Sequence, residues 1–215
     1  YSLLSQDFAK LRHVCDLLQP GLVFVSDAAA YQRAIDAVLP AETPLISVRG
    51  HVPGRAQVSF ASLLQTPGGS AADQAFNATG PDSIAKFLFT SGSTKLPKAV
   101  ITTQRMLCAN QQMLLQTFPV FGEEPPVLVD WLPWNHTFGG SHNVGIVLYN
   151  GGTFYLDAGK PTAQGFAETL RNLKEVSPTA YLTVPKGWEE LVSALEQDAE
   201  LRECFFARMK LFFFA

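Results

Sequence analysis

The sequence predicts an α/β fold, built on a mainly parallel β-sheet with helices on both faces. Short segments that are almost continuously apolar alternate with longer ones whose apolar residues recur at helical spacing. Apolar strands of this kind are typical of a sheet buried on both faces, and their alternation with helices favours parallel crossovers. With 47% hydrophobic and 11% aromatic residues, the chain can also bury a sizeable core.

The first part of the chain opens with an expected helix over residues 5–18. Its apolar residues Phe8, Leu11, Cys15 and Leu18 lie near helical spacing, and a Pro-Gly pair ends it. The elements expected next are a strand at 21–26, a helix at 29–39 and a strand at 44–48. Residues 49–81 are rich in Gly, Pro, Ala and Ser. There we expect connecting surface structure with short helical turns at 60–64 and 72–77.

The remaining elements continue the alternation. We expect strands at 84–89, 99–103, 127–131, 153–156, 180–184 and 210–215, and helices at 103–118, 138–149, 162–176, from 185 onward, and at 198–208. Met106 and Met113 are expected to fill the core. The buried stripe of the helix that Pro185 begins is expected to comprise Trp188, Leu191, Val192 and Leu195.

The most informative segment connects the strands at 84–89 and 99–103. It is a run of small and hydroxylated residues, with Gly92 in the middle and Lys98 after a proline. Gly92 permits a close backbone approach to a ligand, and Lys98 adds a compact positive charge. Such a loop can cradle a polyphosphate. Its hydroxyl donors are Thr90, Ser91, Ser93 and Thr94.

A Walker loop and an ordinary turn are the two alternatives to a polyphosphate-binding loop here. A Walker loop requires glycine where Pro97 stands and Ser or Thr after Lys98, and it opens a helix, whereas a strand-like segment follows here. The Walker pattern is therefore not matched. An ordinary turn between two strands uses the same residue types and stays open on this segment alone.

A second segment strengthens the functional interpretation. The strand at 127–131 leads into Leu-Pro-Trp-Asn-His-Thr-Phe-Gly-Gly at residues 132–140. His136 lies there among aromatic residues, where a histidine can equally be a structural core residue. Asp130 is expected to be a hydrogen-bonded structural carboxylate, and no role is indicated for His142.

Together the two segments resemble the adenylate-forming superfamily, which includes acyl-CoA synthetases, peptide-synthetase adenylation domains and luciferases. The resemblance implies that residues 90–98 form the phosphate loop, in which Thr90, Ser91, Gly92, Ser93, Thr94 and Lys98 bind the phosphates of ATP. It implies that residues 132–140, here called the channel segment, line the acyl and thiol channel with Trp134, His136, Phe138, Gly139 and Gly140. Lys98 and His136 would be the catalytic residues. Lys95 departs from the family's usual glycine.

Within that superfamily, the whole chain is similar to bacterial feruloyl-CoA synthetases. The similarity is less specific than the two motifs and includes Trp-Leu-Pro-Trp-Asn-His-Thr-Phe-Gly-Gly. This implies that residues 1–215 are part of the large N-terminal domain, without the C-terminal domain. It implies an ATP-dependent activation of a hydroxycinnamate such as ferulate to the acyl-adenylate, with pyrophosphate released, followed by transfer to coenzyme A. Magnesium is expected, but its ligands are unknown. The ribose-binding Asp and the adenylation Lys of the family would lie beyond residue 215.

Three alternatives stay open at this point. Another adenylating enzyme, such as a fatty-acyl-CoA ligase or a peptide-synthetase domain, would use the same loop. A P-loop-type kinase or ATPase would produce ADP. A non-catalytic interaction module would leave the hydroxyl-rich loop without a role.

The remaining composition favours a cytoplasmic enzyme. A net charge of −3 with dispersed basic residues does not suggest nucleic acid as a partner. The three cysteines have no metal-type spacing and are expected to be buried free thiols. No apolar run is long enough to span a bilayer, and the first residues, which lack a basic region followed by an apolar one, predict no signal peptide. Three consecutive phenylalanines near residue 215 suggest a fragment of a larger protein. Oligomeric state is not indicated.

Overall fold

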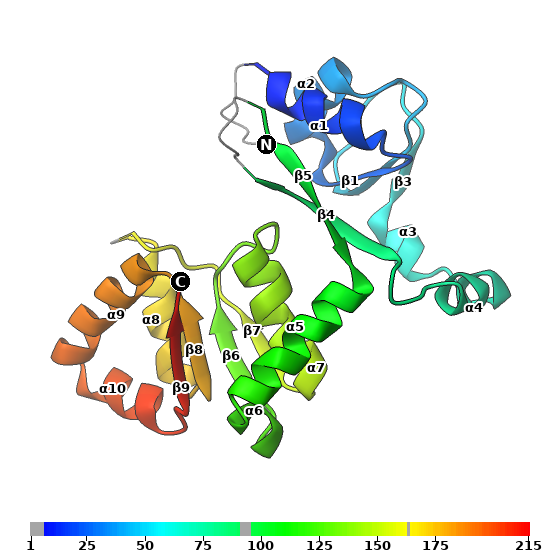
Figure 1. The fold of residues 1–215 in the computed structure, drawn as a ribbon. Coiled ribbons are helices and arrows are strands. Elements are labelled where there is room, and N and C mark those ends of the chain that lie inside the picture. The colour runs from blue at the N-terminus through cyan, green and yellow to red at the C-terminus, as the bar shows by residue number, and fades with distance from the viewer. Residues whose placement is uncertain (1–6, 91–95, 163) are drawn as a thin grey trace. The chain divides into compact units, whose positions relative to one another are not determined.

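The computed structural model describes residues 7–90, 96–162 and 164–215. These form two compact units. The first unit comprises Tyr1–Thr79 and Phe89–Val100, and the second comprises Gly80–Leu88 and Ile101–Ala215. Each unit is an arrangement of helices and parallel strands (Figure 1), as the sequence predicts.

The first unit holds a three-stranded parallel sheet in the order β1-β2-β3. Its elements are α1 (Ala9–Leu18), β1 (Val23–Asp27), α2 (Ala28–Val38), β2 (Leu45–Arg49), β3 (Gln57–Ser59), α3 (Phe60–Leu64) and α4 (Ser70–Asn77). Helix α2 begins at Asp27, whose carboxylate accepts hydrogen bonds from the N–H groups of Ala29 and Ala30. The core of this unit joins α1 and α2 to β1 and β2 through Ile35, Val38, Leu45 and Val52.

Strand β3 is absent from the sequence-based prediction, which expected only connecting structure there. It is three residues long and pairs with β2 at Leu45, Ile46 and Ser47. Sequence patterns predict a strand from apolar residues that alternate with polar ones, and a three-residue segment with one apolar residue is too short to show this pattern. The short helices expected at 60–64 and 72–77 are confirmed as α3 and α4.

The strands β4 (Ile84–Thr90) and β5 (Lys98–Thr103) pair with each other, and the segment between them belongs to the predicted phosphate loop. Both strands are predicted from the sequence to within one residue at each end. The next helix, α5 (Gln104–Thr117), begins at Thr103, whose hydroxyl accepts a hydrogen bond from the N–H of Met106.

The second unit is built on the parallel pairs β6-β7 and β8-β9. After α5 its elements are α6 (Val120–Glu123), β6 (Val127–Asp130), the π-helix η1 (Phe138–Asn143), α7 (Val144–Asn150), β7 (Thr153–Leu156), α8 (Phe166–Glu175), β8 (Ala180–Thr183), α9 (Pro185–Gln197), α10 (Ala199–Phe206) and β9 (Leu211–Phe214). Strand β8 begins beside β6, because Thr179 N–H donates to Val127 O at 3.0 Å.

Helices cover both faces of these strands (Figure 1). Val129 and Tyr181 pack against α8, α9 and α10, whereas their neighbours Leu128 and Leu182 pack with α6 and α7. Because successive residues of a strand point to opposite faces, this division confirms that β6 and β8 are buried on both sides.

Two predicted helix faces are wrong in detail. Met106 and Met113 are 52% and 56% exposed, and Gln111 is buried instead. The inward face of α5 carries Leu114, Leu115 and Phe118 with Gln111, because the helical period places those residues together. In α9 the buried residues are Leu191 and Leu195, with Trp188 packed against them, and Val192 is exposed.

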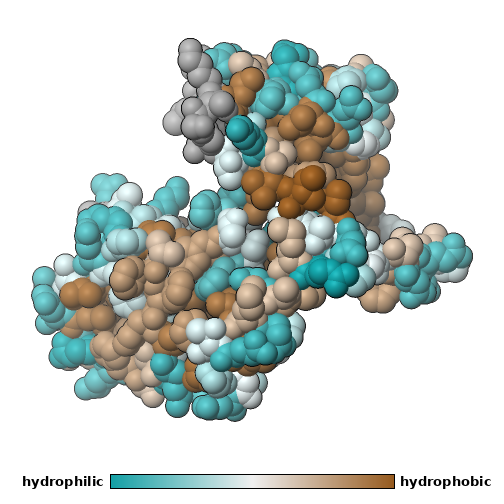
Figure 2. Space-filling view, in the orientation of Figure 1, coloured by the Kyte–Doolittle hydropathy of each residue, from teal (hydrophilic) through white to brown (hydrophobic). Residues whose placement is uncertain are grey.

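Apolar side chains also gather at the surface of the second unit (Figure 2). An apolar groove of about 770 Å³ lies over α9, α10 and β9, and its most exposed large residues are Val192, Phe206, Phe212 and Phe214. Within the described residues, no helix has both the length and the apolar character that crossing a bilayer requires.

The packing of the second unit gives a direct stability test. Leu191 is fully buried, with 0% of its surface exposed, whereas Leu148 on α7 is 78% exposed. We expect Leu191→Ala to lower the free energy of unfolding by about 2–5 kcal/mol, and Leu148→Ala to change it by less than about 1 kcal/mol. Urea unfolding monitored by circular dichroism measures both, and equal effects would contradict the assigned core.

Candidate functional site

The two ends of the predicted phosphate loop, residues 90–98, lie on the paired strands β4 and β5. Thr90 ends β4 and Lys98 begins β5, and both side chains are exposed. The other predicted phosphate-binding residues, Ser91, Gly92, Ser93 and Thr94, lie outside the described residues, as does Lys95. Within the described part, a cation on a long side chain stands at the start of β5 and can reach a bound anion.

A histidine from helix α1 is bound to this loop. His13 Nε2 lies 3.0 Å from the carbonyl oxygen of Pro97, the residue before Lys98. A carbonyl oxygen only accepts hydrogen bonds, so Nε2 of His13 must carry a proton. Sequence reasoning missed this contact because His13 and Pro97 are 84 positions apart.

The channel segment begins where β6 ends. Leu132 is buried, and a turn follows in which His136 N–H donates to Pro133 O at 3.1 Å. Trp134 is 55% exposed and meets Phe154 of β7 edge to face at 6.0 Å between ring centroids. The structure therefore presents Trp134 and His136 on an exposed turn at the end of a buried strand.

The expected helix at 138–149 is two helices in the structure. Residues Phe138–Asn143 form a π-helix, in which Val144 N–H donates to Gly139 O, and α7 continues from there. Phe138 contacts the rings of His142 and Phe213 edge to face. Single-turn π-helices inside α-helices occur frequently at functional sites.

Gly139 and Gly140 allow this wide turn to lie against the preceding backbone. A Cβ at position 140 would stand 1.9 Å from Trp134 O, and one at position 139 would stand 2.7 Å from Pro133 O. No side chain fits at either distance. Lys86 of β4 donates from Nζ to Gly140 O at 2.9 Å, and burial lowers the pKa of Lys86. Sequence reasoning missed this lysine.

The hydrogen bond of His136 defines its tautomer. The Phe138 N–H donates to His136 Nδ1 at 3.2 Å, so the neutral imidazole carries its proton on Nε2. His136 is exposed. It therefore offers an N–H donor to a ligand and not a free lone pair.

Two buried carboxylates lie behind the channel segment at the ends of β6 and β7. Asp130 accepts hydrogen bonds from Leu132 N–H and Asn143 Nδ2, each at 2.8 Å, which confirms the structural carboxylate predicted there. Asp157 accepts from Thr169 Oγ1 at 2.5 Å and from Asn172 Nδ2 at 3.0 Å. Asp157 was not predicted, because a lone Asp after a short strand has no distinctive sequence context.

The described His, Cys, Asp and Glu side chains do not identify a metal site. Among the residues with described positions, no cluster of three or more His, Cys, Asp or Glu side chains could hold a metal ion. The described residues therefore identify no magnesium ligands, and no chemical step is assigned to a metal ion.

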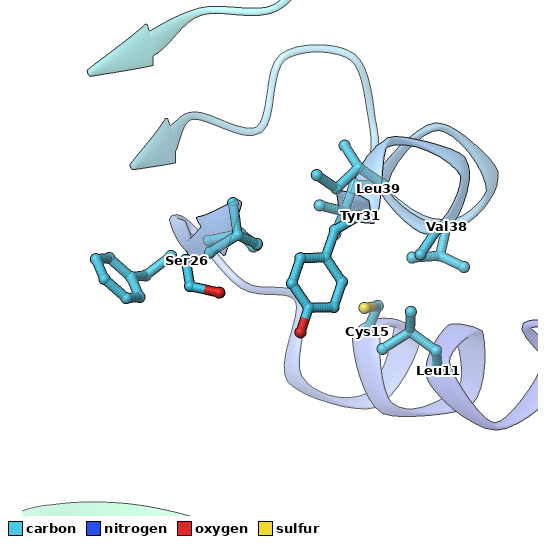
Figure 3. A pocket seen from close by; sticks show the side chains of 11 residues that line it. Leu11, Cys15, Ser26, Tyr31, Val38 and Leu39 are labelled. Carbon is cyan, nitrogen blue, oxygen red and sulfur yellow. The ribbon is translucent and has the colours of Figure 1, made fainter. Parts of the chain in front are cut away.

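A separate apolar pocket of about 270 Å³ lies in the first unit between α1, α2 and β1 (Figure 3). Leu11, Cys15, Tyr31 and Val38 are among its lining residues, and burial raises the pKa of the Cys15 thiol. None of the predicted site residues lines this pocket. All three cysteines are free as expected, but the prediction that they are buried is wrong for Cys108, which is exposed, and Cys15 and Cys204 are only partly buried.

Known proteins resemble this chain over most of its length. The family model described as "AMP-binding enzyme" matches residues 5–211. A carboxylic acid reductase of Mycobacterium marinum is 29% identical over 135 residues, which are 63% of this chain and 11% of the reductase. The medium-chain-fatty-acid–[acyl-carrier-protein] ligase TtuA of Teredinibacter turnerae is 31% identical over 113 residues, 53% of this chain and 14% of the ligase.

Solved structures agree in fold. ATP-bound MatB from Rhodopseudomonas palustris has a TM-score of 0.64 at 21% identity, over 100% of this chain and 38% of that one. The adenylation domain of a keto acid-selecting NRPS module, bound to a keto acyl adenylate, has a TM-score of 0.70 at 19% identity, over 99% of this chain and 36% of that one. The chain thus spans under two fifths of either structure.

The glycine contacts of the channel segment give a testable consequence. We expect Gly140→Ala to displace the turn at Trp134, because its Cβ would overlap the carbonyl oxygen, and to cost more than about 3 kcal/mol of stability. Gly80→Ala is the matched control, since nothing lies within 4 Å of its added Cβ. Thermal unfolding of both variants measures the difference, and a Gly140→Ala variant as stable as the control would refute the close approach.

Proposed function

The chain belongs to the AMP-binding enzyme family, and on that premise we propose that the intact protein activates a carboxylic acid with ATP and passes the acyl group to a thiol. The carboxylate oxygen attacks the α-phosphorus of ATP, and the bond to the bridging oxygen breaks as pyrophosphate leaves. The thiol sulfur then attacks the acyl carbon and releases its proton to solvent, and AMP leaves with the electron pair of the broken bond. The observation that carries this proposal is the hydroxyl-rich loop that ends in Lys98.

In this mechanism residues 90–98 bind the phosphates. Hydroxyls and backbone N–H groups of Thr90, Ser91, Gly92, Ser93 and Thr94, together with the Lys98 ammonium, would neutralise charge on the departing pyrophosphate. Positioning and electrostatic stabilisation contribute most of the catalysis in transfers at phosphorus. Magnesium would arrive as the counter-ion of ATP.

We assign residues 132–140 to the channel where acid and thiol meet. Trp134 and Phe138 supply aromatic surface, and Gly139 and Gly140 let the π-helix lie against the turn that carries Trp134. The exposed Nε2–H of His136 is suited to donate to the acyl oxygen, on which negative charge develops when sulfur attacks. His136 then acts in the thioester step and not in adenylate formation.

For the substrate we propose a hydroxycinnamate such as ferulate, with coenzyme A as the acceptor. The aromatic residues of the channel segment and its likeness to feruloyl-CoA synthetases support this choice. The names of the relatives favour a second candidate, an alkyl acid, since they include fatty-acid ligases for both carrier protein and coenzyme A. A cytoplasmic location also stays a prediction.

The first test measures products. The intact protein is given ATP, Mg²⁺ and a panel of cinnamic, benzoic and alkyl acids, with and without coenzyme A. Pyrophosphate and AMP are the expected products, and ferulate is expected to be among the best acids. Formation of ADP would favour a kinase or ATPase, and absence of ATP binding would favour a non-catalytic module.

The phosphate loop is tested through its lysine. We expect Lys98→Ala to lower the rate of acid-dependent pyrophosphate release by about 10²–10³-fold, because it removes a cation from the developing phosphate charge. The control is Lys10→Ala, which removes an exposed lysine from α1. Unchanged pyrophosphate release in Lys98→Ala would exclude Lys98 from the mechanism.

The channel segment is tested through its histidine. We expect His136→Ala to slow thioester formation by about 10²-fold, because the acyl oxygen loses a donor, and to leave pyrophosphate release within a few fold of wild type. Single-turnover assays with preformed adenylate separate the two steps. A defect confined to adenylate formation would contradict the assigned role.

A further inference from the structure

A buried polar pair brackets the channel segment. Asp130 is the last residue of β6 and Asn143 is the last residue of η1, so residues 131–142 all lie between them. Asp130 is 5% exposed and Asn143 is 0% exposed. Buried polar side chains in this position require a specific reason, because removing them from water costs free energy.

Hydrogen bonds join this pair to both ends of residues 131–142, at Leu132 and at His142. Asp130 Oδ1 accepts from Leu132 N–H, and Oδ2 accepts from Asn143 Nδ2, each at 2.8 Å. The same Asn143 nitrogen lies 3.3 Å from Leu182 O on β8. The Asp130 carboxylate therefore connects the first turn of residues 131–142 to Asn143, the residue that follows them, and Asn143 in turn contacts β8.

The pair also fixes a histidine tautomer. A carboxylate only accepts, so the amide nitrogen of Asn143 must face Asp130 and its oxygen must face His142. His142 Nδ1 lies 2.8 Å from that oxygen and must carry the proton. Burial lowers the pKa of His142, which favours its neutral form and leaves a lone pair on Nε2.

We propose that Asp130 and Asn143 are positioning residues, which hold residues 131–142 in the conformation that presents His136 and keep His142 in its Nδ1–H tautomer. The effect on turnover rests on the proposed function. The positioning itself does not, because it follows from hydrogen bonds within one unit.

The ionisation state of Asp130 controls this arrangement. Burial is the largest cause that raises the pKa of Asp130 to about 6, the nearby Asp157 raises it further, and the hydrogen bonds from Leu132 and Asn143 oppose both. The other titratable groups around the segment are His142, which reaches Asp130 through Asn143, and Lys86, which donates to Gly140 O. Tyr181 of β8 is held protonated by burial.

The sign of the pH effect follows from the acceptor role, for openings that break the two hydrogen bonds while Asp130 stays buried. Above about pH 6 the ionised carboxylate accepts both hydrogen bonds. As the pH falls through about 6, the neutral carboxyl accepts these hydrogen bonds more weakly, and a proton on the oxygen that faces Asn143 would oppose the Asn143 N–H. The positioning is therefore strongest at neutral pH and weakens on acidification.

Hydrogen–deuterium exchange of the intact protein tests the proposal directly. We expect Asp130→Asn and Asn143→Asp each to speed exchange in peptides covering residues 131–143 on the order of tenfold or more, with little change in α1 and α2. The exchanged variant D130N/N143D restores one donor facing one acceptor, so its exchange should be slower than that of either single variant. The exposed pair Asp73→Asn and Asn77→Asp on α4 serves as the control.

A wild-type measurement keeps the test valid if a variant fails to fold. Protection of residues 131–143 relative to α8, corrected for the intrinsic pH dependence of exchange, should fall between pH 7.5 and pH 5.5 with a midpoint at about 6. Unchanged protection across this range, or single variants that exchange like wild type, would overturn the positioning role.

Turnover separates this proposal from the proposed function. If adenylate forms, thioester formation should lose more rate than pyrophosphate release in both single variants, and its pH profile should lose the inflection near 6 in Asp130→Asn. If no acid yields pyrophosphate in wild type, the proposed function fails, and the exchange data still decide the positioning role.

Discussion

The close approach of two backbone segments determines the candidate channel. Position 140 has no room for a Cβ beside the Trp134 carbonyl, and position 139 is nearly as restricted beside Pro133. Once this contact is made, the chain must leave β6 in a tight turn and return as a π-helix. The exposed places of Trp134 and His136 follow from that geometry. A rigid strand thus supports a small exposed turn, which is how binding residues are commonly positioned.

The sequence predicts the regular framework well, because near-continuous apolar strands and helical periods reflect burial directly. It also predicts the two motif segments, since residue type and spacing limit what Gly92, Lys98 and His136 can do, and their roles stay predictions. It could not predict the π-helix, because the pattern over residues 138–149 is that of one apolar helix. Nor could it predict Lys86 on Gly140, or His13 on Pro97, since such contacts depend on tertiary packing and not on a local pattern.

Burial of Asp130 has an energetic cost that its neighbours only partly offset. A carboxyl pKa near 6 in the folded chain against 3.8 for an ordinary Asp means that the folded state binds a proton more tightly than the unfolded one. Its contribution to stability is fully present below the unfolded pKa and is lost as the pH rises through about 6, by about 3 kcal/mol for a difference of this size. At neutral pH the chain therefore retains a charge that weakens folding, while the same charge selects one arrangement of the channel segment.

The contact between His13 and Pro97 behaves differently on acidification. Its acceptor is a backbone carbonyl, which cannot take up a proton in this pH range, and its donor is an imidazole Nε2–H. Both the neutral tautomer and the imidazolium carry hydrogen on that nitrogen, so either form can donate to Pro97. The hydrogen bond between α1 and Pro97 therefore tolerates acid conditions under which a carboxylate acceptor would be neutralised.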